Sequence, residues 1–211
     1  MSGKIITNYS PNFSSITRKP KNIKFLIFHY TGMKSEKNAI NKLINEKSKV
    51  SSHYFIKRNG EIILMVPDLY IAWHAGVSKW KNFSSLNKYS MGIEISNRGH
   101  GNGYKQFTKK QIQSLIMLSK SITKKYRLKK CNILGHSDIA YNRKKDPGEK
   151  FPWKLLSRYK IGIWHNLKKN KLIKKRRAKL NNSEDKKFLK KLSKIGYFVE
   201  KKSILKRKNL I

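Results

Sequence analysis

The sequence predicts an α/β fold, in which a central mixed β-sheet is flanked by helices and followed by a small helical C-terminal extension. Short apolar runs typical of buried strands alternate with longer segments of helical periodicity, the pattern of sheet strands joined by helices. Two strands are instead separated only by Asn59-Gly60, a strong signal for an antiparallel hairpin. We therefore expect residues 1–160 to form one α/β domain and residues 161–211 to form a basic helical extension.

The first half of the chain supplies most of the expected strands. Residues 23–28 (IKFLIF) are almost wholly apolar, which favours a strand buried on both faces, with His29 at its end. Residues 36–49 carry apolar side chains at helical spacing, and the hairpin strands are expected at 53–58 and 61–66. Residues 91–96 (MGIEIS) alternate, so Glu94 faces away from its two isoleucine neighbours.

The second half begins with a helix signal. Thr108 to Gln111 has the form of a capping box, and an apolar helical stripe follows it as far as Tyr126. The strand NILGH then brings His136 to a strand end, and Pro152 suits the first position of a short helix ending near residue 159. Apolar residues recur at helical spacing between 188 and 195, where Gly196 suits a C-cap.

Composition limits the classes of partner. The 50 Lys and Arg against 11 Asp and Glu give a formal charge of +39, which favours anionic partners. The lysines are spread along the whole chain, so a solvated basic surface explains them better than a dedicated binding face. No helix-turn-helix, RNP or zinc-finger pattern occurs, and we expect no specific nucleic-acid partner.

The sequence shows no signal for membrane insertion, export or disulfide bonding. No apolar stretch approaches the ~20 residues that a membrane span needs, and the N-terminus has neither an apolar core nor a cysteine for lipidation. We expect a cytoplasmic protein, or a periplasmic one if a signal has been removed from this chain. Cys131, the only cysteine, lies in the apolar run CNIL and is expected to be a buried strand residue.

Three residues suggest a metal site. His29 and His136 follow apolar runs, and Asp146 is one of few acids in this part of the chain. A zinc hydrolase uses three ligands of this chemistry and keeps a fourth position open for water. We therefore predict one Zn²⁺ per chain, bound by His29, His136 and Asp146.

Other polar residues allow two interpretations each. Glu94, in the middle of an apolar strand, is either a buried ion-pair partner of a lysine or a general base near the metal. Lys144, two residues before Asp146, is either a solvated lysine or a cation beside the metal. The loop containing Trp73 and His74 either covers the core or contacts a sugar or peptide. His53 is expected to pack inside the hairpin, His100 and His165 have no supporting context, and Asp138 is expected in a turn or orienting His136.

Taken together, HYTG, SSHYFIKRNGEI, AWHAGVSKW, YSMGIEISNRG and GHSDIAYNRKKDPGEKFPW resemble the zinc-dependent N-acetylmuramoyl-L-alanine amidases of the second amidase family. The resemblance covers residues 23–160, is greatest to the AmpD and AmiD type, and extends distantly to peptidoglycan recognition proteins. It implies that His29, His136 and Asp146 bind zinc, that Glu94 is the catalytic carboxylate and that Lys144 stabilises the tetrahedral intermediate. Our candidates for substrate contacts are Tyr30, Trp73, His74, Ala75 and Asn87.

The resemblance implies hydrolysis of the amide between N-acetylmuramic acid and L-alanine, in peptidoglycan fragments or 1,6-anhydro-muropeptides. We expect the protein to be a monomer. The alternative is a non-catalytic peptidoglycan-binding protein, because recognition relatives keep the fold and lose a zinc ligand. All proposed ligands are present here, which favours hydrolysis. The extension resembles an incomplete peptidoglycan-binding module. We expect residues from about 165 onward to assist binding to anionic polymers and to be dispensable for cutting a small muropeptide.

Overall fold

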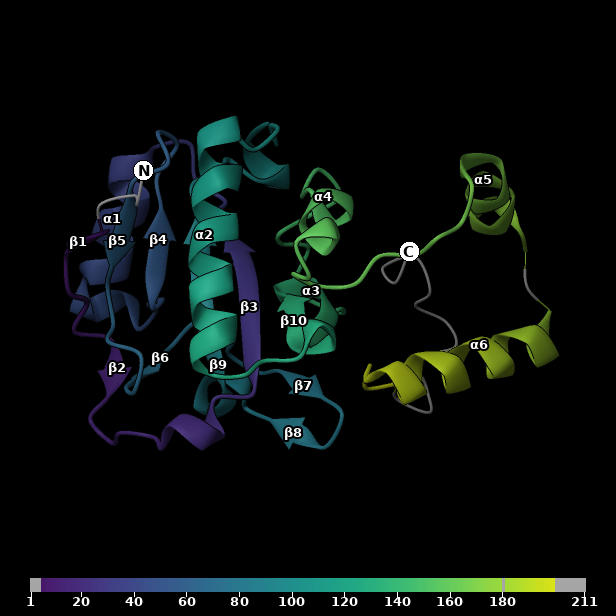
Figure 1. The fold of residues 1–211 in the computed structure, drawn as a ribbon, viewed down its shortest axis with the longest axis horizontal. Coiled ribbons are helices and arrows are strands. Elements are labelled where there is room, and N and C mark those ends of the chain that lie inside the picture. Colours follow the sequence, from purple (N-terminus) through teal and green to yellow (C-terminus); the bar gives the residue numbers. More distant parts are fainter. Residues whose placement is uncertain (1–4, 180, 200–211) are drawn as a thin grey trace.

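The structure, a computed structural model, describes residues 5–179 and 181–199, and its centre is a mixed six-stranded sheet (Figure 1). Only the hairpin of β4 and β5 pairs in antiparallel fashion, and the other neighbours in the sheet are parallel. The mixed sheet is therefore confirmed. The strands in spatial order are β1 (Ile5–Thr7), β5 (Ile62–Leu64), β4 (Tyr54–Ile56), β9 (Ser90–Ile95), β3 (Phe25–Tyr30) and β10 (Ile133–Gly135).

Two small antiparallel sheets and short 3₁₀ turns complete the non-helical framework. One small sheet pairs β2 (Phe13–Ser14) with β6 (Ile71–Ala72), and the other pairs β7 (Lys79–Trp80) with β8 (Phe83–Ser84). The 3₁₀ turns are Pro20–Asn22, Glu46–Ser48, Leu86–Tyr89, His100–Asn102 and Lys130–Asn132.

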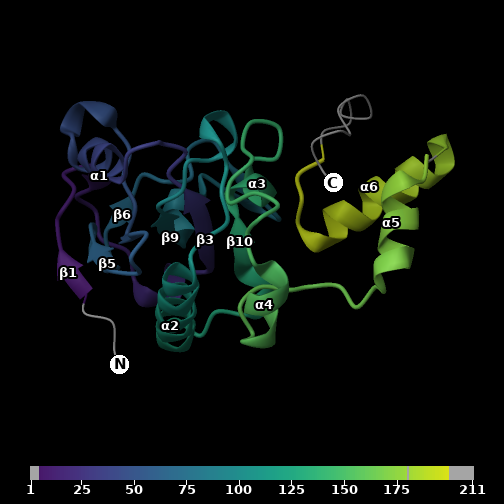
Figure 2. The same ribbon diagram turned by 90° about the horizontal axis from the view of Figure 1, so that it is seen from above.

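Helices cover both faces of the main sheet. α2 (Lys109–Lys125) and α4 (Trp153–Arg158) lie on one side, and α1 (Glu36–Ile44) lies on the other (Figure 2). The short helix α3 (His136–Ile139) follows β10 directly. The predicted capping box of α2 is confirmed, because Gln111 N donates to Thr108 Oγ1 over 3.1 Å and Thr108 N donates to Gln111 Oε1 over 3.0 Å. Pro152 is the N-cap residue of α4 and not its first helical residue.

The sheet separates two main apolar cores. Leu26 and Phe28 of β3 point toward α2 with Ile93 of β9, whereas Phe25 and Ile27 of β3 pack with Trp80 on the other face. This alternation is the reason that the run 23–28 is apolar throughout. The prediction for Cys131 was wrong: it is exposed in the 3₁₀ turn before β10, because the strand begins only at Ile133.

The C-terminal extension forms α5 (Lys169–Arg177) and α6 (Asn182–Ile195), and its end contacts the α/β domain. Gly196, the C-cap of α6, has φ 142°, and its carbonyl accepts a hydrogen bond from Lys81 N over 2.7 Å. The Tyr197 ring lies 4.8 Å from the buried Trp80 ring, centroid to centroid. The Tyr197 hydroxyl also donates to Asp138. These contacts join the extension to the domain that it follows.

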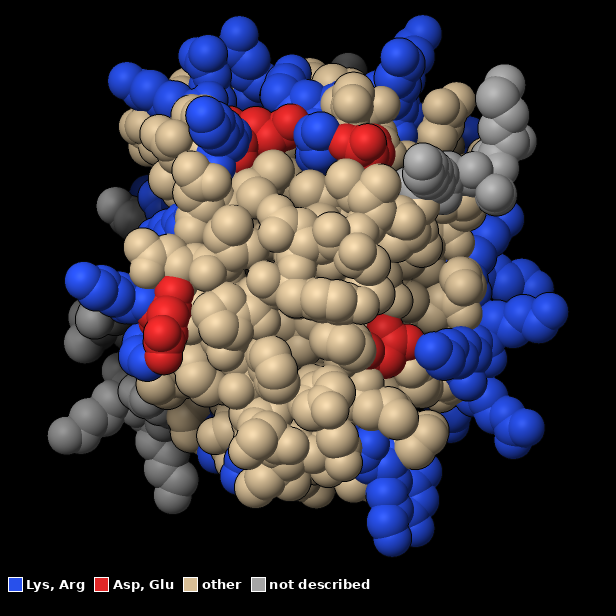
Figure 3. Space-filling view, turned by 90° about the vertical axis from the view of Figure 1, so that its left-hand side faces the viewer, with Lys and Arg blue, Asp and Glu red and all other residues tan. Residues whose placement is uncertain are grey.

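The surface charge is dispersed. On the face that carries β1 and α1, basic side chains lie mainly around the rim and few acidic ones are visible (Figure 3). This distribution agrees with the scattered lysines of the sequence. Within the described residues, no helix is long and apolar enough to cross a bilayer.

Candidate active site

Three parallel strands bring the predicted site residues to one edge of the sheet. His29 lies near the end of β3 and is paired in register with Glu94 of the neighbouring β9. On the other side of β3, Gly135 of β10 pairs with Phe28, so His136, the next residue of that chain segment, comes beside His29. The carboxyl ends of parallel strands are where functional side chains gather in such sheets.

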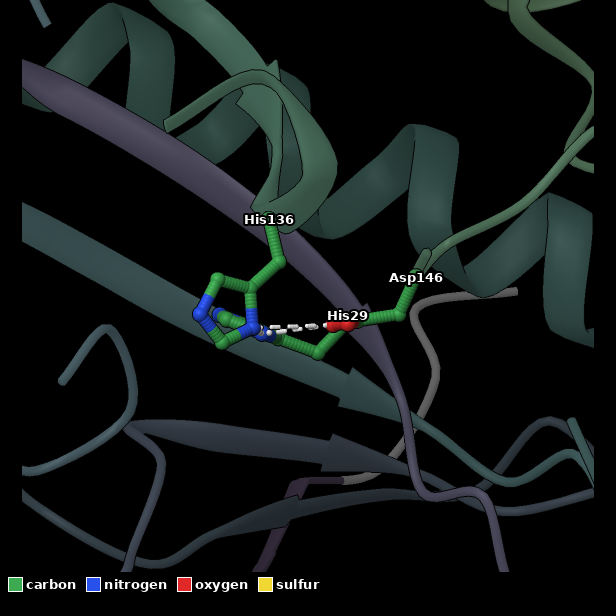
Figure 4. Close-up of side chains that lie close together, drawn as sticks. All are labelled: His29, His136 and Asp146. Atoms are coloured by element: carbon green, nitrogen blue, oxygen red, sulfur yellow. Dashed lines mark hydrogen bonds and ion pairs between the residues drawn. The ribbon is translucent and has the colours of Figure 1, made fainter. Parts of the chain in front are cut away.

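The side chains of His29, His136 and Asp146 converge on one point (Figure 4). The two Nδ1 atoms are 2.9 Å apart, and Asp146 Oδ2 lies 3.1 Å from His29 Nδ1 and 3.0 Å from His136 Nδ1. All three residues are buried. Two imidazoles and a carboxylate thus face one another at the buried end of the strands.

Electrostatics favour the metal-binding protonation states of His29 and Asp146. Burial, and then the nearby His136, lower the pKa of His29 to about 4, so its imidazole is neutral at pH 7. Burial raises the pKa of Asp146, but the close approach of its carboxylate to the His136 and His29 rings outweighs burial and holds that pKa well below its usual range. Neutral imidazole and carboxylate are the forms in which these side chains bind metal.

The donor set fits zinc. Ligands about 2.0–2.1 Å from a tetrahedral ion lie roughly 3.3 Å from one another, close to the separations of this triangle. Each histidine directs Nδ1 at the centre and uses Nε2 elsewhere, so both present one lone pair to a common point. The three residues offer two nitrogen donors and one oxygen donor, the set that a catalytic zinc site combines with an open fourth position.

Glu94 lines the same cavity, and none of the described lysines or arginines forms an ion pair with it. Its Oε2 is buried and accepts no hydrogen bond from the described residues. Burial, and then the negative charge of Asp146, raise its pKa to about 8. A divalent cation at the neighbouring cluster would favour the charged form and so lower this pKa. A carboxylate that is desolvated but otherwise unused is suited to proton transfer.

The cavity in front of the cluster has a volume of about 520 Å³, and most of the predicted site residues line it. Tyr30, Trp73, His74 and Lys144 line it, together with Glu94. Two other candidates for substrate contacts lie outside its lining: Ala75 is fully buried, and the Asn87 side chain accepts hydrogen bonds from backbone NH groups. Ala75 and Asn87 therefore shape the loop behind the cavity and do not line the cavity themselves.

His100 is a cavity residue that the sequence interpretation set aside. Its Nδ1 lies 2.9 Å from the Tyr30 hydroxyl, and its Nε2 lies 2.8 Å from Glu149 Oε2. No local sequence pattern signals this contact, because the three residues belong to separate loops and strand ends. His53 packs within the sheet as expected, where its Nδ1 accepts a hydrogen bond from Gly92 N over 3.0 Å.

Asp138 has a different role from the orientation of His136. Its Oδ2 accepts a hydrogen bond from Gly135 N over 2.7 Å, which caps the first turn of α3, and its Oδ1 accepts from Tyr197. His136 Nε2 instead donates to the carbonyl of Ala75 over 3.1 Å. Asp138 therefore lies in the short helix α3 and not in the expected turn, and the expected contact with His136 is also wrong.

Comparisons with known proteins point to one enzyme family. The family described as N-acetylmuramoyl-L-alanine amidase matches residues 19–149. The chain is 36% identical over 190 residues to the N-acetylmuramoyl-L-alanine amidase AmiD of Escherichia coli, covering 84% of this chain and 68% of that protein. It is 39% identical over 105 residues to the 1,6-anhydro-N-acetylmuramyl-L-alanine amidase AmpD of the same organism, covering 50% of this chain and 55% of AmpD.

Solved structures show the same likeness. Escherichia coli AmiD in complex with anhydro-N-acetylmuramic acid-L-Ala-D-γ-Glu-L-Lys matches with a TM-score of 0.73 and 34% identity, covering 89% of this chain and 76% of AmiD. AmpDh3 of Pseudomonas aeruginosa in complex with anhydromuramic pentapeptide also gives 0.73, at 29% identity, covering 90% of this chain and 80% of that one. Together with the family match over residues 19–149, these likenesses establish that this chain belongs to the N-acetylmuramoyl-L-alanine amidase family.

Proposed function

We propose that this protein is a zinc-dependent hydrolase that cleaves the amide between N-acetylmuramic acid and L-alanine in peptidoglycan fragments. The observation that carries the proposal is the buried triangle of His29, His136 and Asp146, with Glu94 paired in register beside it at the same cavity. The substrate class rests on the family and on relatives whose structures hold anhydro-muramyl peptides.

The residues of the site have distinct tasks in such a reaction. Zinc, when bound, lowers the pKa of water and polarises the scissile carbonyl. Glu94 accepts the proton of the attacking water at its carboxylate and then passes it to the leaving amine of L-alanine. Lys144, which lines the same cavity, places a positive charge where the tetrahedral intermediate develops its oxyanion.

The cavity also fits the proposed substrate in character. Trp73 and Tyr30 offer aromatic surface for a sugar ring or peptide. Lys144 and Lys145 also line the cavity, and their basic side chains suit the carboxylates of a stem peptide. We propose Tyr30, Trp73 and His100 as substrate contacts. Tyr30 and His100 are held together by their hydrogen bond and therefore act as one wall.

The experiment that tests the function uses a defined anhydro-muropeptide and mass spectrometry of the products. We expect release of the intact stem peptide, loss of this reaction with a chelator, and recovery on adding zinc. Calorimetry on the zinc-loaded protein separates the alternative: a protein that binds the muropeptide and leaves it uncut is a binding protein and not an amidase.

A further inference from the structure

Both histidines of the metal cluster use their second ring nitrogen on the same short loop. His29 Nε2 lies 3.0 Å from Nδ1 of His74, and His136 Nε2 lies 3.1 Å from the carbonyl oxygen of Ala75. The two acceptors are consecutive residues of one loop. That loop therefore contacts both imidazoles from the side opposite to their converging Nδ1 atoms.

The hydrogen-bond directions in this network can be worked out from its far end. Ser90 has one hydroxyl proton, which it donates to the carbonyl of Leu86 over 2.6 Å. Its oxygen therefore accepts from Nε2–H of His74 over 3.2 Å. A neutral His74 ring carries only that proton. Its Nδ1 is then an acceptor, and His29 must donate from Nε2.

The same reasoning applies more directly to His136. A backbone carbonyl only accepts, so His136 donates to Ala75 from Nε2. In a neutral ring the proton on Nε2 leaves Nδ1 with a free lone pair. Both histidines are thus fixed in the tautomer that presents Nδ1 to the metal position.

The loop itself is held in place by independent contacts. Asn87 Oδ1 accepts from the backbone NH groups of His74 over 3.1 Å and of Ala75 over 2.7 Å. Arg143 Nη2 donates to the Ala75 carbonyl over 2.6 Å. A Cβ added to Gly92 would lie 2.5 Å from Cγ of His74, so the bare backbone of β9 at this position makes room for the ring.

We propose that His74 is a positioning residue of the metal site, which together with the Ala75 carbonyl sets the tautomer and orientation of both histidine ligands. The proposal rests on the proposed zinc site and goes beyond it. Outer partners of metal-bound histidines typically affect metal affinity 10–100-fold. It also gives a reason for Ser90 and Gly92, whose contacts seat and orient the His74 ring.

The test measures the zinc dissociation constant of the full chain by competition with a chromophoric chelator. His74→Phe fills the ring volume without an acceptor and is expected to weaken zinc binding 10–100-fold. His74→Asn, whose amide oxygen can take the place of Nδ1, should recover most of the affinity. Gly92→Ala should weaken zinc binding as His74→Phe does. The added methyl group pushes the His74 ring out of position, although the substitution removes no hydrogen-bond donor or acceptor.

A serine pair supplies a second line of evidence if His74→Phe fails to fold. Ser90→Ala removes the acceptor that orients His74, and it should weaken zinc binding. Ser119→Ala is the matched control: Ser119 is also fully buried, its Oγ has no hydrogen-bond partner among the described residues, and it lies on α2 away from the cluster. Equal zinc affinity of these two serine variants would overturn the proposal.

Nuclear magnetic resonance reads the tautomers directly. Two-bond ¹H–¹⁵N spectra of the zinc-loaded protein should show His29 and His136 protonated at Nε2, and metal bound through Nε2 would refute the network. A folded His74→Phe that binds zinc as tightly as the parent overturns this inference alone. A parent chain that binds no zinc overturns the proposed function as well, so the two failures are distinguishable.

Discussion

His29 and Glu94 are directly paired across the parallel strands β3 and β9. Paired residues on neighbouring strands project to the same face of a sheet, so the register alone places the carboxylate beside the metal cluster. Ile93 and Ile95, on either side of Glu94, point into the opposite core with α2. A shift of one residue would bury the acid among those apolar groups and expose an isoleucine at the site.

Glu94→Gln is expected to lower turnover by about 10²–10⁴-fold, because it removes proton transfer and preserves the volume of the side chain. Zinc content should remain one per chain. The measurement is muropeptide cleavage by mass spectrometry together with metal analysis. Glu61→Gln is the control, since Glu61 forms a partly exposed pair with Lys57 away from the site. Turnover close to the parent's would leave Glu94 with a structural role only.

The same substitution should change how the stability of the zinc-free protein depends on pH. The pKa of Glu94 is raised from 4.5 to about 8, so the folded chain keeps a proton that the unfolded chain releases. Stability is therefore lost as pH rises from about 4.5 toward 8, by an amount on the order of 4–5 kcal/mol. Urea unfolding with a chelator should show Glu94→Gln more stable than the parent at pH 8 and similar at pH 4. If Glu94→Gln were more stable than the parent by the same amount at pH 4 and pH 8, the ionisation of Glu94 would not be the reason.

Loss of a cluster residue should abolish the stabilisation that zinc provides. A ligand that binds only the folded chain stabilises it by about 2.7 kcal/mol at a concentration 100 times its dissociation constant. We expect zinc to raise the melting temperature of the parent and to leave His136→Ala nearly unchanged. His165→Ala is the matched control, because His165 lies outside the cluster. An undiminished zinc effect in His136→Ala would remove His136 from the ligand set.

Tyr197→Phe is expected to destabilise the protein by about 1.5–3 kcal/mol, because it takes a hydrogen bond from the partly buried carboxylate of Asp138. Urea unfolding measures this, with Tyr159→Phe as control, since Tyr159 is partly exposed. Deletion of residues 165–211 should cost more, because it also uncovers Trp80. A deletion variant as stable as the parent would support the sequence-based expectation that the extension is separate and dispensable.

The basic surface of α5 should assist binding to wall polymer through charge alone. Lys174 and Lys175 are exposed, and their replacement by Glu reverses two charges on this helix without affecting a buried contact. Sedimentation with sacculi at 0.1 M salt should fall in this variant and fall for both proteins at 1 M, where the screening length shortens from ~10 Å to ~3 Å. Cleavage of a small muropeptide serves as the control and should not change. Salt-independent sedimentation would exclude an electrostatic role.

Much of the fold was predictable because local patterns and tertiary packing agree. Asn59-Gly60 predicted the hairpin, the capping box at Thr108 predicted the start of α2, and the apolar run before His29 predicted a buried strand. Cys131 was misassigned because an apolar sequence does not reveal where a strand begins. His100 was passed over because its partners, Tyr30 and Glu149, are 70 and 49 residues away.

The sequence by itself determined which residue types could bind a metal and that His29 and His136 follow strands, because periodicity and residue chemistry are local properties. Only the tertiary structure decided that Glu94 pairs with His29, that His74 and Ala75 take up the outer nitrogens of both histidines, and that Tyr197 reaches Asp138. Strand register and loop docking depend on packing between segments far apart in the chain. No local pattern encodes them.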